Sequence, residues 1–266
     1  MHCASYFGID DVVAALIESE DCDINQSDCS GFTALTWAAQ QGNEGVVRRL
    51  LARDGVNPDK PSDGGETPLW CASFQGHERV VKLLLARNDV NPDKPTNEGR
   101  TPLWSASYSG HGEVVELLLA RNDVNPDKPS DDDRTPLWNA SYNGHGGVVK
   151  LLLTRDDVNP DEPNNQGETP LRSASYSGHE GVVEILLARN DVNPDRPNNK
   201  DETPLWGASY NGHEGVVKLL LARNEVNPDK PRNDGRTPFL CASRNEHEGV
   251  VKLLMERCQS PQAKQS

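Results

Sequence analysis

Residues 101–134 read TPLWSASYSGHGEVVELLLARNDVNPDKPSDDDR, and the same pattern begins seven times along the chain. Each start lies 34 residues after the one before it. A fixed period of this length indicates an array of stacked structural repeats, in which each unit packs only against its neighbours. The seven starts are Thr33, Thr67, Thr101, Thr135, Thr169, Thr203 and Thr237.

The sequence of each 34-residue repeat predicts a short helix, a turn, a second helix and a polar loop. Thr67 suits an N-cap, and Pro68 suits the first helical position, where its missing N–H costs nothing. Gly76 can end that helix with a positive φ. The run VVKLLL at residues 80–85 gives the second helix an apolar face, and Pro92 stops that helix before the loop.

The array starts inside a unit, because residues 2–6 align with residues 70–74 without a preceding Thr-Pro-Leu. We therefore expect a partial first unit at residues 1–32, a repeat array over residues 1–258 and a disordered tail at residues 259–266. Terminal repeats usually need a polar capping face. One interpretation is that the chain is a fragment or a truncated product. The alternative is that three polar residues serve as the cap, namely Asp10, Glu18 and Ser19.

The composition excludes several classes of partner. A net charge of −14 argues against nucleic acid, whose phosphates need clustered Lys and Arg. The acidity either keeps the array soluble or favours basic partners. No apolar run reaches the ~20 residues that span a bilayer, and no signal peptide is visible. The cysteines show no CxxC spacing, which is typical of reduced thiols in a cytoplasmic or nuclear protein: Cys3, Cys22, Cys29, Cys71, Cys241 and Cys258.

The consensus T-P-L-x-x-A-x-x-x-G-H-x-x-V-V-x-L-L-L…D-V-N resembles the ankyrin repeat across residues 33–257. The family repeat has about 33 residues, and here one residue is added in the Asn-Pro-Asp-Lys-Pro loop. Only His2 keeps the histidine of the family's TPLH motif. The resemblance implies an all-α solenoid of stacked helix-turn-helix units with projecting β-turn or hairpin fingers. The TPLH histidine is replaced by Thr36, Trp70, Trp104, Trp138, Arg172, Trp206 and Leu240.

The resemblance also implies which positions bind a partner. The last residues of the first helix face the concave groove, and the residues before each Thr form the finger tips. The groove positions are Tyr6, Gln40, Phe74, Tyr108, Tyr142, Tyr176, Tyr210 and Arg244. The finger-tip positions are Arg100, Arg134, Glu168, Glu202 and Arg236.

The aromatic column among the groove positions has two interpretations. Rings repeated where the core does not require them are typical of interface anchors. Alternatively, each ring packs against the neighbouring repeat and only stiffens the array. We expect the Trp column to serve inter-repeat packing.

The sequence contains no recognisable catalytic or ligand constellation. Six histidines occupy the Gly-His column, where copies about 10 Å apart cannot share a metal, so we expect them to be structural. No Gly-Lys phosphate loop is present. The acidic run at residues 131–133 lacks the Gly and Glu of a calcium loop. Asn25 and Asn139 match glycosylation acceptors, which we discount without a secretory signal.

These observations predict a protein that is not an enzyme and that has no cofactor, no metal and no membrane insertion. We expect a monomeric scaffold for protein–protein interaction that binds a polypeptide on its concave face. The alternative is a sensing or regulatory repeat segment of a larger multidomain protein, for example an NTP-binding one, whose effector domain is absent here. The identity of the partner is not contained in the sequence.

Overall fold

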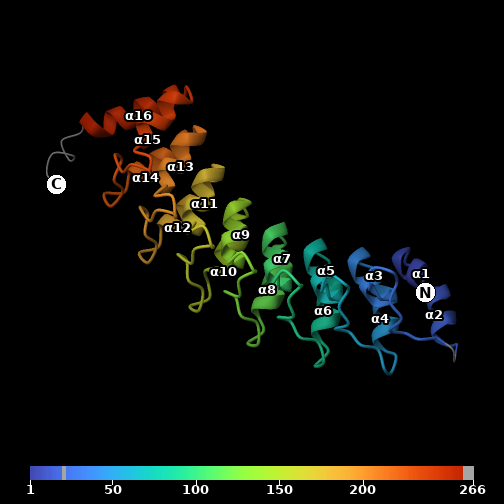
Figure 1. The fold of residues 1–266 in the computed structure, drawn as a ribbon. Coiled ribbons are helices and arrows are strands. Elements are labelled where there is room, and N and C mark those ends of the chain that lie inside the picture. The colour runs from blue at the N-terminus through green and yellow to red at the C-terminus, as the bar shows by residue number, and fades with distance from the viewer. Residues whose placement is uncertain (20–21, 260–266) are drawn as a thin grey trace. The chain divides into compact units, whose positions relative to one another are not determined.

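The computed structural model describes residues 1–19 and 22–259, and the chain divides into two compact units. The first is Met1–Asp131 and the second is Asp132–Ser266. Sixteen helices lie in the described part, together with one isolated bridge between Ser27 and Thr33 (Figure 1). The all-α fold class is therefore confirmed.

Each full repeat contributes two helices, which we call its first and second helix. In the first unit they are α1 (His2–Tyr6), α2 (Asp10–Ile17), α3 (Ala34–Gln41), α4 (Glu44–Leu51), α5 (Pro68–Gln75), α6 (Glu78–Leu85), α7 (Pro102–Ser109) and α8 (Gly112–Leu119). In the second unit they are α9 (Pro136–Tyr142), α10 (Gly146–Leu152), α11 (Pro170–Ser177), α12 (Glu180–Leu187), α13 (Pro204–Asn211), α14 (Glu214–Leu221), α15 (Pro238–Arg244) and α16 (Glu248–Gln259).

The first helix begins and ends where the sequence predicts. Thr101 Oγ1 accepts a hydrogen bond from the backbone N–H of Trp104 at 3.1 Å, and Pro102 occupies the first helical position. Gly110 follows the helix with a φ of 81°, a left-handed conformation that favours glycine. The same Thr cap is present in all seven repeats.

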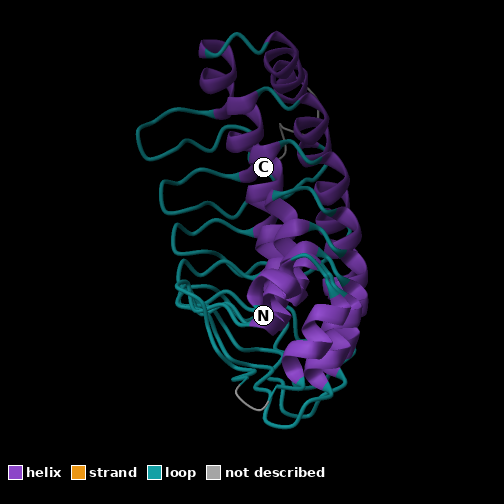
Figure 2. Ribbon diagram, turned by 90° about the vertical axis from the view of Figure 1, so that its right-hand side faces the viewer, coloured by secondary structure: helices purple, strands orange, loops and turns teal. Residues whose placement is uncertain are grey.

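Within each unit, helices pack as two rows. The first helices α3, α5 and α7 contact one another in sequence, as do α9, α11, α13 and α15. The second helices form the other row, and the polar loops leave both rows on the same side (Figure 2). The core between the rows consists of the repeated apolar columns: Leu103, Ala106, Val115 and Leu118 have no exposed surface.

The histidine of each Gly-His pair joins its repeat to the preceding one. His111 Nε2 lies 3.1 Å from the carbonyl oxygen of Phe74. The ring also lies against the glycine of the preceding repeat, since a Cβ added to Gly76 would come within 2.5 Å of His111 Nδ1. The predicted structural role is confirmed for five of these histidines, which make the same carbonyl contact: His77, His111, His179, His213 and His247.

The extra residue of the repeat lies in a loop that adds a second connection between neighbours. Lys94 Nζ donates to the carbonyl oxygen of Asp59 at 2.6 Å, and Asp59 Oδ2 accepts from the backbone N–H of Asn91 at 2.8 Å. Lys128 and Asn125 make the same two contacts with Asp93. In these repeats, the loop that contains the inserted residue therefore makes side-chain bonds to the preceding loop.

An arginine supplies a third connection. Arg121 Nη1 donates to the carbonyl oxygen of Leu85, at the end of the second helix of the preceding repeat, over 2.9 Å. The same guanidinium holds Asp123 at 2.8 Å. Because terminal carbonyls of a helix lack intrahelical partners, this arginine caps a neighbouring helix in the manner of a basic C-terminal residue. Arg87, Arg189 and Arg223 repeat the contact.

The two ends of the array differ from its middle. Val12 and Leu16 on α2 are 45% and 36% exposed, whereas the equivalent Val80 and Leu84 on α6 are 1% and 0% exposed. At the other end, α16 extends to Gln259. The rest of the tail predicted for residues 259–266 lies outside the described residues.

Candidate protein-interaction surface

The aromatic column lies in the last turn of the first helices and reaches the surface. Tyr142, Tyr176 and Tyr210 are 43%, 37% and 39% exposed in the second unit. In the first unit Tyr6 and Tyr108 are similarly exposed. The remaining groove positions are partly exposed at Gln40 and Phe74 and exposed at Arg244.

Four rings of the column are held by a tryptophan one turn earlier on the same helix. The rings of Trp138 and Tyr142 are stacked, with centroids 5.2 Å apart and planes 12° apart. Because residues four apart lie on one face of a helix, this pairing follows from the repeat pattern. The same stacking, at 5.2–5.4 Å, joins Trp70 to Phe74, Trp104 to Tyr108 and Trp206 to Tyr210.

The tryptophans also connect the start of a repeat to its end. Trp138 Nε1 donates to the carbonyl oxygen of Glu168 at 2.9 Å, and Trp206 Nε1 donates to that of Arg236 at 3.1 Å. Both rings are almost fully buried. Both bonds lie within one 34-residue repeat, so the role of the Trp column in packing between repeats stays a prediction. The stacking of Trp138 and Trp206 holds the rings of Tyr142 and Tyr210 in place.

The residues before each Thr are not at the finger tips, so this prediction needs correction. Thr96 N–H donates to the carbonyl oxygen of Arg100 at 3.0 Å, which closes a turn whose tip is residues 97–98. Glu168, Glu202 and Arg236 stand at the same position of their turns. The backbone pairing places these residues on the returning arm, next to the first helix.

The arginines on the returning arms are paired within the chain. Arg100 holds Glu98 at 2.6 Å, and Arg134 holds Asp132 at 3.0 Å. Arg100 and Arg134 also place their guanidinium carbons 5.0 Å and 4.6 Å from the rings of Trp104 and Trp138. Arg236 forms an ion pair with Asp234, which lowers the pKa of that carboxyl group.

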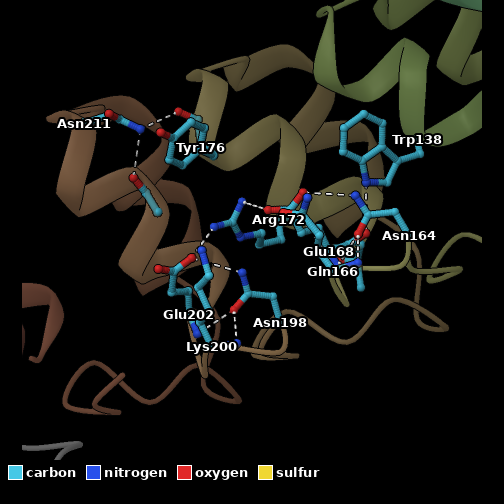
Figure 3. Close-up of polar contacts among 12 residues, drawn as sticks. Trp138, Asn164, Gln166, Glu168, Arg172, Tyr176, Asn198, Lys200, Glu202 and Asn211 are labelled. Carbon is cyan, nitrogen blue, oxygen red and sulfur yellow. Dashed lines mark hydrogen bonds and ion pairs between the residues drawn. The ribbon is translucent and has the colours of Figure 1, made fainter. Parts of the chain in front are cut away.

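The two glutamates of this column belong to a buried ion network in the second unit (Figure 3). Arg172 Nη1 lies 2.7 Å from Glu168 Oε1, and its Nη2 lies 2.6 Å from Glu202 Oε2. Glu202 also pairs with Arg232 at 3.3 Å. Arg172 and Glu202 are only 5% and 7% exposed. Glu202 is therefore not accessible to a partner, unlike the finger-tip position that the sequence predicts for it.

Arg172 is the residue that sequence reasoning noticed without giving it a role. It occupies the Trp column, and its guanidinium carbon lies 5.1 Å from the ring of Tyr176, where four other repeats place an indole. Its sequence signal is the acidic residue at Glu168, four positions earlier, together with the acidic Glu202 at the end of the same repeat. The side-chain amides of Asn164 and Asn198 complete the network by donating to these glutamates.

The described residues contain no candidate metal centre. No group of three or more His, Cys, Asp or Glu among them could hold a metal ion. The five described cysteines are free, and burial raises the pKa of the Cys71 thiol to about 12, which keeps it protonated. Asn139 is 1% exposed and donates to the carbonyl oxygen of Thr135, so a glycan cannot be attached to it in the folded array.

No helix in the described ranges has the length and apolar content needed to cross a membrane. No curated protein matches the sequence significantly. The human ASB11 ankyrin repeat domain, known from a crystal structure, superposes with a TM-score of 0.76 at 27% sequence identity. The superposition covers 86% of this chain and 100% of that chain. The family model for ankyrin repeats, which describes three copies, matches residues 1–62, 54–130, 122–198 and 188–265. The chain therefore belongs to the ankyrin repeat family.

Proposed function

We propose that the chain is a non-catalytic scaffold that holds a polypeptide partner on the face formed by its first helices. Ankyrin repeats are in general modules of protein–protein interaction. The observation that carries the proposal is the row of Tyr142, Tyr176 and Tyr210, three successive rings that are each well exposed and each fixed by a side chain of the same helix.

Exposure and rigidity together favour an interface. Tyrosine offers a large apolar surface with a polar tip, and interface hot spots are enriched in it. Stacking on Trp138 and Trp206 restricts the rotamers of Tyr142 and Tyr210 before any partner arrives. Binding of a partner therefore costs less side-chain conformational entropy than it would if the tyrosine rings were mobile.

The arms beside the tyrosines contribute little charge to the proposed surface. Arg134 and Arg236 already have carboxylate partners, and Glu168 and Glu202 are held by Arg172. An exposed ion pair contributes about 0–1 kcal/mol, and a partner would have to compete with it. We assign these residues to shaping the surface and setting register rather than to affinity.

We further propose that the protein is a monomer that works in the cytoplasm or nucleus and does not bind nucleic acid. The net charge of −14 argues against binding to nucleic acid. The free cysteines of the described part are typical of a protein in a reducing compartment.

A capture experiment tests the function. The full chain, a Tyr142→Ala/Tyr176→Ala variant and a Lys150→Ala/Glu184→Ala control serve as bait, and captured proteins are quantified by mass spectrometry. The control changes exposed second-helix residues of the same two repeats. The proposal expects polypeptides that bind the wild type and the control but are lost from the tyrosine variant. Equal capture by all three baits would contradict it.

A further inference from the structure

We propose that the face carrying Tyr142, Tyr176 and Tyr210 binds an uncharged segment in the polyproline II conformation, with proline or another apolar residue at every third position. This inference rests on the proposed function and specifies the chemistry of the partner. Three properties of the rings carry it, namely their spacing, their hydroxyl groups and the charge of the residues around them.

The first property is the distance between successive tyrosine rings. The three tyrosines occupy the same position of α9, α11 and α13, which pack side by side. Packed helices lie about 8–10 Å apart, so successive rings recur at about that distance. A polyproline II segment rises ~3.1 Å per residue and repeats every three residues, which gives about 9 Å. A β-strand returns to one face after two residues, or about 6.5–7 Å, and does not match the ring spacing.

The hydroxyl groups distinguish a polyproline II segment from an α-helix. An α-helix repeats about every 10.5 Å over seven residues, so spacing alone does not reject it. The hydroxyls of Tyr142, Tyr176 and Tyr210 make no hydrogen bond to any described residue. They can donate to a partner's carbonyl groups. A polyproline II backbone has no internal hydrogen bonds and offers its carbonyls, whereas a helix has already used nearly all of its own.

The surroundings of Tyr176 explain why the segment is uncharged. Arg172 lies against the Tyr176 ring, and both ends of its guanidinium fork are taken by Glu168 and Glu202 (Figure 3). The next helix also approaches this ring closely, since a Cβ added to Gly207 would lie 3.5 Å from the Tyr176 side chain. A charged partner side chain would lose water here without gaining an unpaired counter-ion.

Proline suits this face for a further reason. Its ring is compact and apolar, and a proline-rich segment is already extended, so binding costs little conformational entropy. Tyr142 and Tyr210 are likewise held in place by Trp138 and Trp206. Both partners are then ordered before they meet, which is the condition under which three small contacts give measurable affinity.

Synthetic peptides test the inference on the full chain. The probe is a labelled ten-residue peptide that repeats Pro-Leu-Ala, and its matched control has the same composition with the prolines out of the three-residue period. Further probes replace Ala by Lys or by Glu, and one is a helical Ala-based peptide with Leu at every seventh position. Fluorescence anisotropy gives each Kd at low and high salt.

We expect the periodic peptide to bind at least about tenfold more tightly than the scrambled one. Between about 0.05 and about 0.5 M salt its Kd should change by less than about threefold, because no ion pair forms. Tighter binding of the Lys or Glu peptide, or of the helical peptide, would overturn the inference.

A conservative variant isolates the hydroxyl groups. Replacing Tyr142, Tyr176 and Tyr210 together by Phe keeps the stacked rings and removes only the three donors. We expect the Kd of the periodic peptide to rise by about tenfold or more, since three hydrogen bonds are lost and each contributes modestly to binding. An unchanged Kd would contradict the assigned backbone contacts. Circular dichroism and the melting midpoint confirm that the variant is folded.

Failure of this inference can be separated from failure of the proposed function. If captured proteins depend on the tyrosines but the periodic peptide does not displace them, the partner chemistry is wrong and the function stands. If no captured protein depends on the tyrosines, the function itself is wrong.

Discussion

Arg172 Nη2 lies 2.6 Å from Glu202 Oε2, thirty residues later in the same repeat, and the same buried guanidinium pairs with Glu168, the last residue of the preceding repeat. The same column holds an apolar ring in Trp138 and Trp206. Removing two charges from water costs several kcal/mol, which a good pairing geometry only offsets. The network therefore specifies which repeats lie side by side more than it adds to the free energy of unfolding.

Stability measurements on Arg172 variants test this view. We expect Arg172→Ala to lower the free energy of unfolding by about 3–5 kcal/mol, because it leaves Glu168 and Glu202 without their shared cation. Urea unfolding followed by circular dichroism gives the value.

A matched triple replacement provides the control. Glu168→Arg, Arg172→Trp and Glu202→Arg together reproduce the arginine and tryptophan found at Arg134 and Trp138. We expect this protein to be at least as stable as the wild type, as buried ion networks often are when replaced whole. A triple variant as unstable as Arg172→Ala would show that the network itself stabilises the array.

The core columns give a second prediction. Leu118 has no exposed surface, and Leu118→Ala should cost about 2–5 kcal/mol through lost burial and a remaining cavity. Leu117, its neighbour on α8, is only partly buried, and its replacement by Ala should cost about 1 kcal/mol. Equal losses in urea unfolding for the two variants would contradict the packing described for the repeat.

Much of the fold could be predicted because it depends on residues that are close in sequence. The Thr cap, the Pro at the first helical position and the final Gly define the first helix locally, and the structure places them as expected at Thr101, Pro102 and Gly110. The i, i+4 stacking of Trp104 on Tyr108 could also have been predicted from helical spacing.

The network of ion pairs could not be predicted in the same way. A repeat pattern fixes the position of Glu202 but not the direction of its side chain, which is held by the guanidinium of Arg172, thirty residues earlier. The loop bond from Lys94 to Asp59 likewise joins residues 35 positions apart. The predicted position of the finger tip is wrong because the tip depends on the backbone hydrogen bond between Thr96 and Arg100, which the repeat pattern does not show.

A third prediction concerns the loop aspartates. Burial raises the pKa of Asp93 above its ordinary value of 3.8, although the backbone N–H of Asn125 and the charge of Lys128 oppose the shift. Between 3.8 and the raised value the folded state binds more protons than the unfolded state, so this group's contribution to stability falls as pH rises. Asp93→Asn removes the titration, and its stability relative to wild type should increase from acidic to neutral pH.

Asp123 provides the control of opposite sign. The guanidinium of Arg121 lowers the pKa of Asp123, so its contribution is present above 3.8 and is lost as pH falls through the folded value. Asp123→Asn should therefore lose stability relative to wild type as pH rises. Urea midpoints across the acidic range measure both variants, and a pH-independent difference for Asp93→Asn would disprove the assignment.

The arm residue Arg134 gives a fourth prediction. It pairs with Asp132 and lies over Trp138, so a partner gains little from it. Arg134→Ala should weaken partner binding by about 1 kcal/mol or less, and what effect there is should diminish at high salt. A large loss that persists at high salt would place Arg134 among the anchors.

The most direct test of the account is the affinity of the Tyr142→Ala/Tyr176→Ala protein for a captured partner, measured by calorimetry beside a thermal unfolding curve. If the rings are binding anchors, the double variant should lose about 2 kcal/mol or more of binding free energy, while the Lys150→Ala/Glu184→Ala control binds normally. Normal binding by a tyrosine variant that melts markedly earlier would show that the rings only pack, and would contradict the account.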